Sequence, residues 1–246
     1  MSQKVALVTG ASSGIGNAIV LSLVDAGYFV MATGRDAART EQLRNQCADV
    51  QTWVGDITSV DSCVDLVSSC IDQFGRLDLL VNNAGIYHAA IAEDTSDDNW
   101  LQTIAINLNT PFYLSREAMP YLRKTKGAIL NVASDWGLVG GKQAVAYCAS
   151  KGGIVLMTKA MALDHAHEGI RVNAICPGDV ETPMLYAEGA VRGLDSAEAV
   201  READRASPTG RVTTPREVAA LVTFLASDAA SQITGAAIPI DGGNTA

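Results

Sequence analysis

Cysteine is scarce in this chain of 246 residues, with five copies and no Cys-x-x-Cys pair. An odd number without paired spacing argues against a disulfide framework and favours a reducing compartment, so we expect a cytoplasmic location. Histidine is scarcer still. His165 and His167 lie two positions apart, which would place them on different faces of a helix. We therefore expect no metal site.

Long apolar runs are also missing. No stretch of eighteen consecutive apolar residues occurs, so we expect no segment that spans a membrane. The N-terminal segment reaches glycine at Gly10, which is too early for a secretory signal peptide. Both absences favour a protein that has no membrane partner.

Positive charge is the third shortage. Lysine and arginine number 18 against 27 aspartates and glutamates, which gives a net charge of −9. An acidic chain repels phosphate backbones, so we expect no nucleic-acid partner. Hydrophobic residues, by contrast, make up 48% of the chain, which is enough for a large core and excludes disorder. At roughly 150 residues per domain, the length allows one or two domains.

Short apolar runs recur along the chain and are separated by longer segments of helical period. The runs are continuous rather than alternating, which predicts strands buried on both faces of a parallel sheet. They cover residues 5–9, 29–33, 51–54, 77–81, 128–132, 171–175 and 237–240. Helices are predicted after Gly14, over 60–71, from Thr95 or Ser96 through Leu114 with a kink at Pro111, over 145–166 and over 215–226.

This alternation predicts one α/β domain over residues 1–246. Its core would be a doubly wound, seven-stranded and mostly parallel sheet with helices on both faces. One charged stretch, residues 179–213, shows no clear period and contains Gly189, Gly193 and Pro208. We expect it to be an irregular, mobile insertion that serves as a substrate lid.

A glycine-rich turn follows the first apolar run. Its glycines, at positions 10, 14 and 16, are spaced differently from the common Gly-x-Gly-x-x-Gly dinucleotide fingerprint. The physics is similar, because Gly10 permits a tight turn, Gly14 admits a pyrophosphate and Gly16 allows close helix–strand packing. The helix beginning near Gly14 would offer free N–H groups to phosphate. Taken alone, the motif is also compatible with an ordinary glycine-rich turn.

The residues after the second apolar run bear on the cofactor. An acidic side chain there would hydrogen-bond the adenosine ribose and favour NAD, but this chain has Gly34 followed by Arg35. A guanidinium at that place can form a forked contact with a 2′-phosphate, so the sequence favours NADP(H). The alternative is an exposed surface arginine neutralised by Asp36.

Tyr147 and Lys151 lie four residues apart on a predicted helix and would share one face. A phenol has an ordinary pKa near 10 and is a poor base at neutral pH. A nearby ammonium group would stabilise the phenolate and lower that pKa. The pair could then give a proton to a carbonyl oxygen and take it back in the reverse direction, although many helices carry such a pair by chance.

In combination these motifs are specific. Thr-Gly-x-x-x-Gly-Ile-Gly at 9–16, Asp56, Asn-Asn-Ala-Gly at 82–85, Asn107, Ser134, Tyr-x-x-x-Lys at 147–151 and Pro-Gly at 177–178 occur in this order. The order and spacing resemble the single-domain branch of the short-chain dehydrogenase/reductase family, from Val5 to Gly243. The resemblance implies a Rossmann-type fold, a nicotinamide cofactor and a small carbonyl or alcohol substrate.

The resemblance also implies a role for each matching residue. Tyr147 would be the general acid/base, with Lys151 lowering its pKa and holding the nicotinamide ribose. Ser134 would hydrogen-bond the substrate oxygen. Asn107 would hold a water that links Lys151 to solvent. The cofactor would contact Gly10, Ser12, Ser13, Gly14, Ile15, Gly16, Arg35, Asp56, Ile57, Asn83, Ala84, Gly85, Tyr147, Lys151, Pro177, Gly178, Val180 and Thr182.

Two departures from the family pattern affect these expectations. Many relatives that use NADP have a basic residue at the position of Ser13, so the preference for NADP rests here on Arg35. Asp135 and Trp136 follow Ser134, where small residues are more usual. Trp136 would narrow the substrate pocket, stack on a flat substrate or simply pack.

The leading hypothesis is an NADP(H)-dependent oxidoreductase that reversibly reduces a ketone or aldehyde. Members of the family that it resembles commonly form tetramers, so the resemblance also implies a homotetramer, with an interface on the long helices near Trp100 and Tyr147. A 3-oxoacyl carrier-protein reductase is an alternative, disfavoured by the acidic composition and by Trp136. A catalytically silent nucleotide sensor is another, disfavoured because Asn107, Ser134, Tyr147 and Lys151 are all present.

Overall fold

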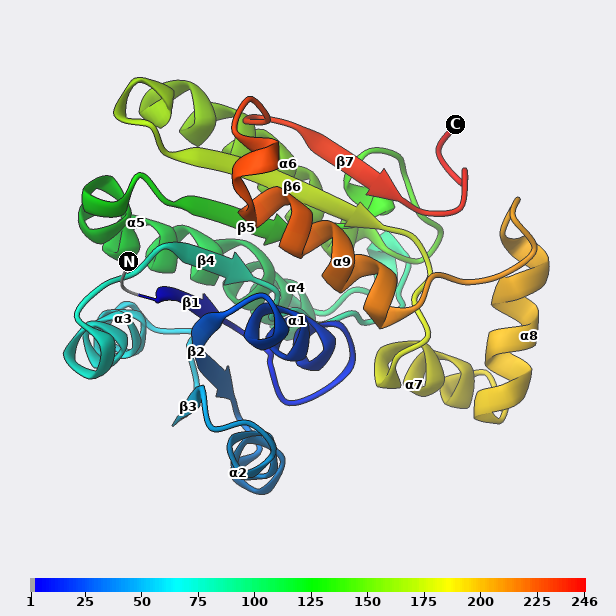
Figure 1. Ribbon diagram of the computed structural model, residues 1–246. Coiled ribbons are helices and arrows are strands. Elements are labelled where there is room, and N and C mark those ends of the chain that lie inside the picture. Colours follow the sequence, from blue (N-terminus) through cyan, green and yellow to red (C-terminus); the bar gives the residue numbers. More distant parts are fainter. Residues whose placement is uncertain (1–2) are drawn as a thin grey trace.

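Seven strands form one sheet in the computed structural model, which describes residues 3–246 (Figure 1). Each neighbouring pair is parallel, and the order is β3-β2-β1-β4-β5-β6-β7. The strands are β1 Lys4–Val8, β2 Tyr28–Gly34, β3 Val50–Val54, β4 Leu79–Asn82, β5 Ala128–Val132, β6 Arg171–Pro177 and β7 Ala237–Ile240. The predicted doubly wound sheet is confirmed, and it is parallel throughout.

Helices cover both faces of the sheet, as predicted (Figure 1). One core lies beneath α1, α2 and α9, and a second lies beneath α3 and α5. In β1, Ala6 and Val8 belong to the first core, whereas Val5 and Leu7 belong to the second. This alternation explains the continuous apolar runs, because both faces of each central strand are buried.

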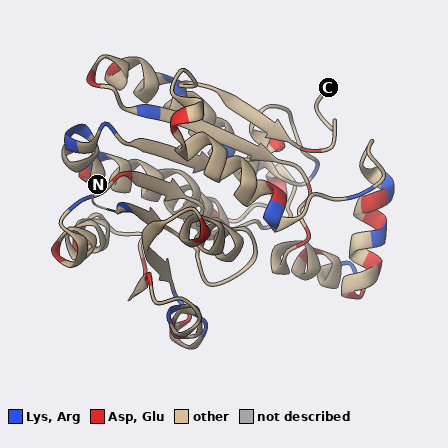
Figure 2. Ribbon diagram, in the orientation of Figure 1, with Lys and Arg blue, Asp and Glu red and all other residues tan. Residues whose placement is uncertain are grey.

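The α-helices are α1 Gly14–Asp25, α2 Ala37–Gln46, α3 Val60–Phe74, α4 Asp97–Ile104, α5 Thr110–Thr125, α6 Val145–His165, α7 Pro183–Val191, α8 Ser196–Ala206 and α9 Pro215–Ala226. Short 3-10 turns cover Ala92–Asp94, Asp135–Gly137, Ala166–Glu168 and Asp228–Ala230. Charged residues are frequent on the outer helices, notably α8, and sparse in the sheet (Figure 2). Among the described residues, no helix has the length and apolar character needed to cross a bilayer.

The helix expected to run from Ser96 through Leu114 with a kink is interrupted instead. A π-helical segment, Ala105–Asn109, separates α4 from α5, and α5 continues to Thr125. Pro111 stands in the first turn of α5. Because proline has no N–H, it cannot donate the α-helical hydrogen bond to the carbonyl of Asn107. The regular ladder is therefore broken at this residue.

The stretch 179–213 differs from the expectation of an irregular insertion. It folds into α7 and α8, which stand apart from the sheet at the right of Figure 1. Leu185, Ala203 and Val212 form a small core of their own. Asp195 caps α8 through a reciprocal hydrogen-bonded box with Glu198, which stabilises the helix start.

Candidate active site

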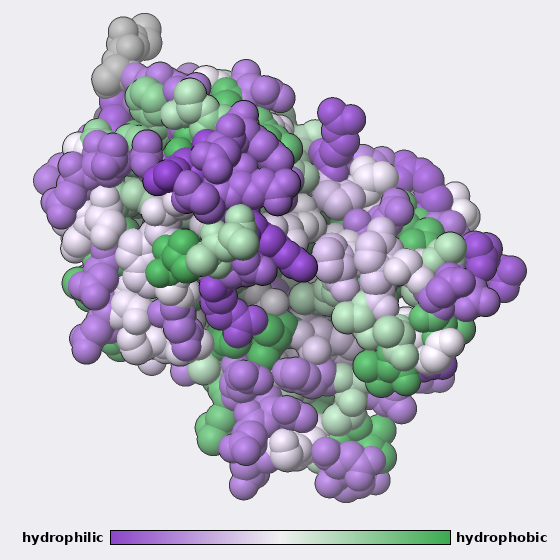
Figure 3. Space-filling view, turned by 90° about the horizontal axis from the view of Figure 1, so that it is seen from below, coloured by the Kyte–Doolittle hydropathy of each residue, from purple (hydrophilic) through white to green (hydrophobic). Residues whose placement is uncertain are grey.

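The carboxyl ends of the strands border a cleft of about 490 Å³. The strand order reverses between β1 and β4, and ligands of open α/β sheets bind at such a point. In the space-filling view the surface is hollowed between the body of the molecule and the part at the right, where α7 and α8 lie (Figure 3). Pro183, Met184 and Leu185 of α7 form part of the wall.

The glycine-rich turn gives the backbone close access to this cleft. Gly10 and Gly14 have φ angles of 63° and 51°, in the left-handed region that favours glycine. A Cβ on Gly16 would lie 2.1 Å from the carbonyl oxygen of Gly10, so only glycine fits there. Helix α1 begins with no side-chain cap from Ser13 and no acidic residue in its first turn. Its first N–H groups are therefore available to a phosphate.

Asn83 braces the ends of β1 and β4. Its side-chain amide donates hydrogen bonds to the carbonyl oxygens of Thr9 and Gly10, at 2.8 and 3.2 Å. The Thr9 hydroxyl in turn accepts the backbone N–H groups of Asn83 and Ala84, each at 3.0 Å. These bonds hold the floor of the cleft in one arrangement.

The far end of the cleft combines a tight turn with two arginines. A Cβ on Gly34 would lie 2.7 Å from the hydroxyl of Thr40 and 2.9 Å from that of Ser12. Arg35 and Arg39 both line the cleft. Asp36 caps α2 by accepting the N–H of Arg39 at 3.0 Å, and it pairs with the Arg39 guanidinium at 3.4 Å. Within residues 3–246, no acidic side chain forms an ion pair with Arg35.

The opposite end holds Tyr147 and Lys151, which α6 places on one face. The Lys151 ammonium lies 5.6 Å from the centre of the Tyr147 ring. The Ser134 hydroxyl, which donates to Asp135 at 2.9 Å, lies close enough to the phenol to oppose the effect of burial on its pKa. Burial dominates, however, and raises the pKa of Tyr147 above its ordinary value of 10.0. The expected lowering by Lys151 is not found, because desolvation of the phenolate outweighs every favourable contact.

Lys151 is itself deeply buried, with 4% of its surface exposed. Its ammonium donates a 2.8 Å hydrogen bond to the carbonyl oxygen of Val132 at the end of β5. Burial disfavours the charged form and lowers the pKa of Lys151 from 10.5 to about 8. A lysine whose pKa lies near neutral pH, next to a half-buried phenol, is typical of acid–base sites.

Asn107 lies behind the cleft rather than on its surface. Its side-chain oxygen accepts the backbone N–H of Ile86 at 2.8 Å, and its amide donates to the Ile86 carbonyl oxygen at 2.9 Å. The amide also donates to the Ser150 hydroxyl at 3.1 Å, and Ser150 donates to the Tyr147 carbonyl oxygen at 2.8 Å. Asn107 therefore ties the loop after β4 to the turn of α6 that carries Tyr147.

Asp135 connects Ser134 to the C-terminal segment. Its carboxylate accepts the Ser134 hydroxyl at 2.9 Å and the backbone N–H of Trp136 at 2.7 Å. The second carboxylate oxygen accepts the side-chain amide of Asn244 at 2.9 Å. Only 4% of Asp135 is exposed, so these donors, rather than water, satisfy its carboxyl oxygens.

Aromatic rings surround the phenol. Tyr87 and Trp136 lie edge-on to Tyr147, with ring centres 5.3 and 6.2 Å away, and they contact each other at 5.8 Å. Such edge-to-face pairs are favourable and fix the ring orientations. Trp136 therefore packs against the phenol and also lines the cleft.

The cleft collects all the residues predicted to contact a cofactor. Ser134 joins them, whereas Asn107 does not line the cleft. The full predicted set along the cleft is Gly10, Ser12, Ser13, Gly14, Ile15, Gly16, Arg35, Asp56, Ile57, Asn83, Ala84, Gly85, Ser134, Tyr147, Lys151, Pro177, Gly178, Val180 and Thr182.

Sequence reasoning did not name Arg39, Tyr87 or Asn244, which line the cleft, and it placed Asp179 and Glu188 only as part of the expected lid over 179–213. Arg39 had a usable signal, because it follows Arg35 by four residues and lies one turn into a helix capped by Asp36. Glu188 belongs to a helix that was not predicted, and Asn244 reaches the cleft only in the folded chain, so no local pattern identified either residue.

Comparison with known proteins identifies the family. The model described as Enoyl-(Acyl carrier protein) reductase matches residues 10–245. L-fucose dehydrogenase of Mus musculus is 41% identical over 244 residues, which are 98% of this chain and 88% of that protein. The chain belongs to the short-chain dehydrogenase/reductase family. D-beta-hydroxybutyrate dehydrogenase of Cupriavidus necator is a further relative, 40% identical over 250 aligned positions, or 98% of this chain and 97% of that protein.

Solved structures of family members match closely. Actinorhodin polyketide ketoreductase with NADPH has a TM-score of 0.94 and 32% identity, over 99% of each chain. The 3-ketoacyl-(acyl-carrier-protein) reductase of Brucella melitensis, with NADH, has a TM-score of 0.91 and 30% identity, over 100% of this chain and 99% of that one. As a member of this family the protein is a nicotinamide-dependent oxidoreductase of small alcohol or ketone substrates.

Proposed function

We propose that this protein is an NADP(H)-dependent oxidoreductase that interconverts a ketone or aldehyde and its alcohol, with Tyr147 as general acid/base. The observation that carries the proposal is the grouping of Ser134, Tyr147 and Lys151 at one end of the cleft, with Arg35 at the other. A pure binding protein does not require a phenol, a hydroxyl and an ammonium group together at one end of its cleft.

The residues present fit a dinucleotide. The uncapped N-terminus of α1 and the turn at Gly14 would hold the pyrophosphate. Asp56 and Ile57 would contact the adenine, and Pro177, Val180 and Thr182 would hold the nicotinamide end. When bound, the nicotinamide accepts or supplies the hydride.

Arg35 supports NADP(H) over NAD(H). Gly34 has no space for the acidic side chain that would bind a ribose hydroxyl, because a Cβ there already meets Thr40 and Ser12. Asp36 is engaged by the N–H and guanidinium of Arg39, which leaves Arg35 available for a 2′-phosphate.

The chain's own residues would move one proton. In reduction, the Tyr147 hydroxyl gives its proton to the carbonyl oxygen while the Ser134 hydroxyl hydrogen-bonds that oxygen. In oxidation, the phenolate accepts the alcohol proton. The raised pKa keeps Tyr147 protonated, as the acid role requires, but makes it a weaker proton donor, and the positive charge of an oxidised nicotinamide would favour the phenolate for the reverse role. Lys151 would leave the Val132 carbonyl to bind the ribose, and Asn107 would keep Tyr147 in position.

The proposal also covers the location, the assembly and the substrate lid of the protein. The protein acts in the cytoplasm as a homotetramer, with α7 and α8 as the substrate lid over a single domain. Trp100, Leu101, Leu156 and Leu163 support an interface on α4 and α6, because these apolar side chains are exposed.

Replacing Tyr147 tests the chemistry. Tyr147→Phe keeps the ring packing but removes the proton donor, so we expect a loss of kcat of about 100-fold or more with NADPH affinity retained. Tyr121→Phe on α5 is the matched control. The assay follows nicotinamide absorbance with a panel of ketones, aldehydes and 3-oxoacyl thioesters. Undiminished turnover in Tyr147→Phe would exclude Tyr147 as the acid.

Replacing Arg35 tests the cofactor preference. Arg35→Ala should raise the KM for NADPH about 10- to 100-fold and leave the KM for NADH nearly unchanged, because only a 2′-phosphate meets the guanidinium. Arg44→Ala on the same helix-bearing segment, where Arg44 pairs with Glu41, is the control. Equal effects on both cofactors would assign Arg35 a structural role instead.

A further inference from the structure

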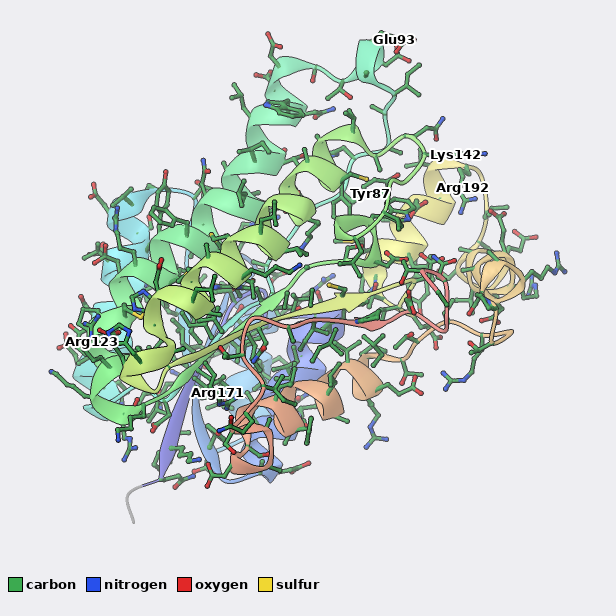
Figure 4. All side chains as sticks on the ribbon, turned by 90° about the horizontal axis from the view of Figure 1, so that it is seen from above. Tyr87, Glu93, Arg123, Lys142, Arg171 and Arg192 are labelled. Atoms are coloured by element: carbon green, nitrogen blue, oxygen red, sulfur yellow. The ribbon has the colours of Figure 1, made fainter. Side chains whose placement is uncertain are left out.

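Asp135 is a buried carboxylate that the proposed proton transfer does not use. It directly follows Ser134, and only 4% of its surface is exposed. No lysine, arginine or histidine among residues 3–246 forms an ion pair with it. Tyr87, which lines the same cleft, marks this end of the molecule, and Arg123 and Arg171 lie at the other end (Figure 4). Burying a carboxylate without a cation costs free energy unless hydrogen-bond donors surround it.

One of the donors around Asp135 is the Ser134 hydroxyl itself. A single carboxylate oxygen accepts that hydroxyl at 2.9 Å and the backbone N–H of Trp136 at 2.7 Å. The same N–H also points to the Ser134 oxygen, at 3.2 Å. Because a carboxylate only accepts hydrogen bonds, the one proton of the Ser134 hydroxyl is directed at Asp135.

These two contacts fix the rotation of the Ser134 side chain. A serine hydroxyl has three staggered positions about the Cα–Cβ bond, and the contacts with Asp135 and Trp136 favour the one seen here. In that position the Ser134 oxygen lies close to the Tyr147 phenol. A substrate oxygen must meet both groups at once, and such sites tolerate displacements of only about 0.5 Å. The rotation of Ser134 is therefore important for turnover.

The other oxygen of Asp135 is held by the C-terminal segment. The side-chain amide of Asn244 donates to it at 2.9 Å, from 109 positions away in the sequence. A turn that begins at Asp241 presents Asn244 to the site. The Asp241 carboxylate accepts the N–H groups of Gly243 and Thr245, at 3.0 and 2.9 Å, and the Thr245 hydroxyl at 2.6 Å.

This turn is fixed to the sheet next to Asp135. The N–H of Gly178, which follows β6, donates to the carbonyl oxygen of Ile240, the last residue of β7, at 3.3 Å. A Cβ on Gly178 would lie 3.0 Å from the Cα of Asp241 and 3.4 Å from the outer oxygen of Asp135. The ends of β5, β6 and β7 therefore approach closely here, and the C-terminal turn has a defined position relative to Ser134.

We propose that Asp135 is a positioning residue that acts through Ser134, and that Asn244 holds Asp135 in place. This inference rests on the proposed function, because Ser134 is the residue whose hydroxyl meets the substrate oxygen. With an alcohol bound, the Ser134 proton stays directed at Asp135. With a carbonyl compound bound, the proton turns to the substrate oxygen, while the Trp136 N–H keeps the Ser134 oxygen where it is. Ser134 keeps its proton in both cases.

Two replacements of Asp135 separate its hydrogen bond from its charge, which adds to the effect of burial on the pKa of Tyr147. Asp135→Ala removes the acceptor and frees the Ser134 side chain to rotate, so kcat should fall about tenfold or more. Asp135→Asn removes the charge but keeps an acceptor oxygen, and the Asn244 amide can turn over to face the new NH2 group, so kcat should stay within about threefold. The KM for NADPH should change less than about twofold in both variants.

Exchange of donor and acceptor tests the role of Asn244. In Asn244→Asp, two carboxylates face each other across the 2.9 Å contact, so Asp135 should shift and kcat should fall about fivefold or more. Adding Asp135→Asn restores one donor and one acceptor, so the double variant should have a kcat at least about threefold above that of Asn244→Asp. Nonspecific damage to the fold would not be reversed by a second substitution.

The assay follows nicotinamide absorbance with the panel of ketones, aldehydes and 3-oxoacyl thioesters, and uses the compound that the native protein turns over fastest. Asp164→Ala and Asn45→Asp are the matched controls and should keep the native kcat, because both residues are exposed and neither lines the cleft. Thermal unfolding shows whether each variant is folded. If Asp135→Ala does not fold, the exchange with Asn244 still decides, because Asn244 lies on the surface.

The outcomes are distinct. Native kcat in Asp135→Ala, or equal losses in Asp135→Ala and Asp135→Asn, would overturn the role of the Ser134 hydrogen bond. Native kcat in Asn244→Asp, or a double variant no faster than Asn244→Asp, would overturn the role of Asn244. A loss of turnover in Tyr147→Phe would support the proposed function in all these cases. A native protein that turns over none of the panel with either cofactor would overturn the proposed function and the inference together.

Discussion

Lys151 should make the stability of this protein depend on pH in a way that one substitution removes. The folded state lowers the pKa of Lys151 from 10.5 to about 8. Burial of this side chain therefore costs folding free energy at any pH at which the side chain is protonated in the folded protein. At 1.36 kcal/mol for each pH unit, this difference corresponds to about 3 kcal/mol of lost folding stability below pH 8. Between pH 8 and 10.5 the unfolded chain binds more protons, so stability rises with pH and the penalty disappears.

The Lys151→Met variant should lack this dependence. The free energy of unfolding of the native protein should rise by about 2 kcal/mol relative to Lys151→Met between pH 7 and pH 9.5. At pH 7 the two proteins should be within a few kcal/mol of each other, because the variant also leaves the Val132 carbonyl without its 2.8 Å donor, at a cost of about 1–3 kcal/mol. Tyr147 stays protonated across this window, since its pKa is raised.

Urea unfolding at several pH values measures the effect, and Lys159→Met, at an exposed position of the same helix, is the control. The control should follow the pH dependence of the native protein. Parallel curves for the native protein and Lys151→Met would refute the reasoning, because they would mean that burial does not disfavour the ammonium.

Two further substitutions test the packing of the cleft and the contacts at the amino ends of the central strands β1 and β4. Gly16→Ala places a Cβ 2.1 Å from the Gly10 carbonyl oxygen, so it should lower NADPH affinity at least tenfold and lower Tm by several degrees; Gly140→Ala, with open space around it, should do neither. Asp78→Ala removes a buried acceptor that Arg76 contacts with two nitrogens and that accepts the Val5 N–H at 2.8 Å. It should cost about 3–5 kcal/mol in chemical denaturation, and an effect below 1 kcal/mol would show that the pair is not needed.

The strands were predictable because the physics that defines them is local. Parallel strands buried on both faces are apolar at most positions, as the central strands are here, and each of the seven runs overlaps one strand of the sheet, with boundaries shifted by at most two residues. Helices with strong apolar faces were found for the same reason. The end of α9 at Ala226 follows directly from the sequence pattern, as does its start at Pro215.

The missed helices have weak apolar patterns. Helix α2 buries only Thr40 and Leu43, so its sequence shows little periodicity. The two helices of the 179–213 stretch pack mainly against each other, as Gly189 does against Ala199. The capping box of Asp195 and Glu198 was a readable signal for α8 that periodicity alone does not use.

The cofactor half of the cleft was predictable because it is built from residues that directly follow strands. Ser134 and Tyr147 of the substrate half were also predicted, but the contacts around them were not, because these contacts join segments far apart in the chain. Asp135 and Asn244 are separated by 109 positions and meet through one hydrogen bond. The pKa of Tyr147 could not be predicted either. Whether it is raised or lowered depends on burial, which the spacing of residues in the sequence does not reveal.

The π-helical segment Ala105–Asn109 changes the direction in which the side chains after it point. Its wider turn rotates the faces of α5 relative to those of α4. A helical wheel drawn from Trp100 onward therefore gives wrong side-chain directions from Ala105 on. Each residue of an α-helix advances the direction of its side chain by about 100°. Deleting one residue here would bring the two helices into step and turn Asn107 away from Ile86 and Ser150. The irregular turn is therefore the feature that aims Asn107 at the active site.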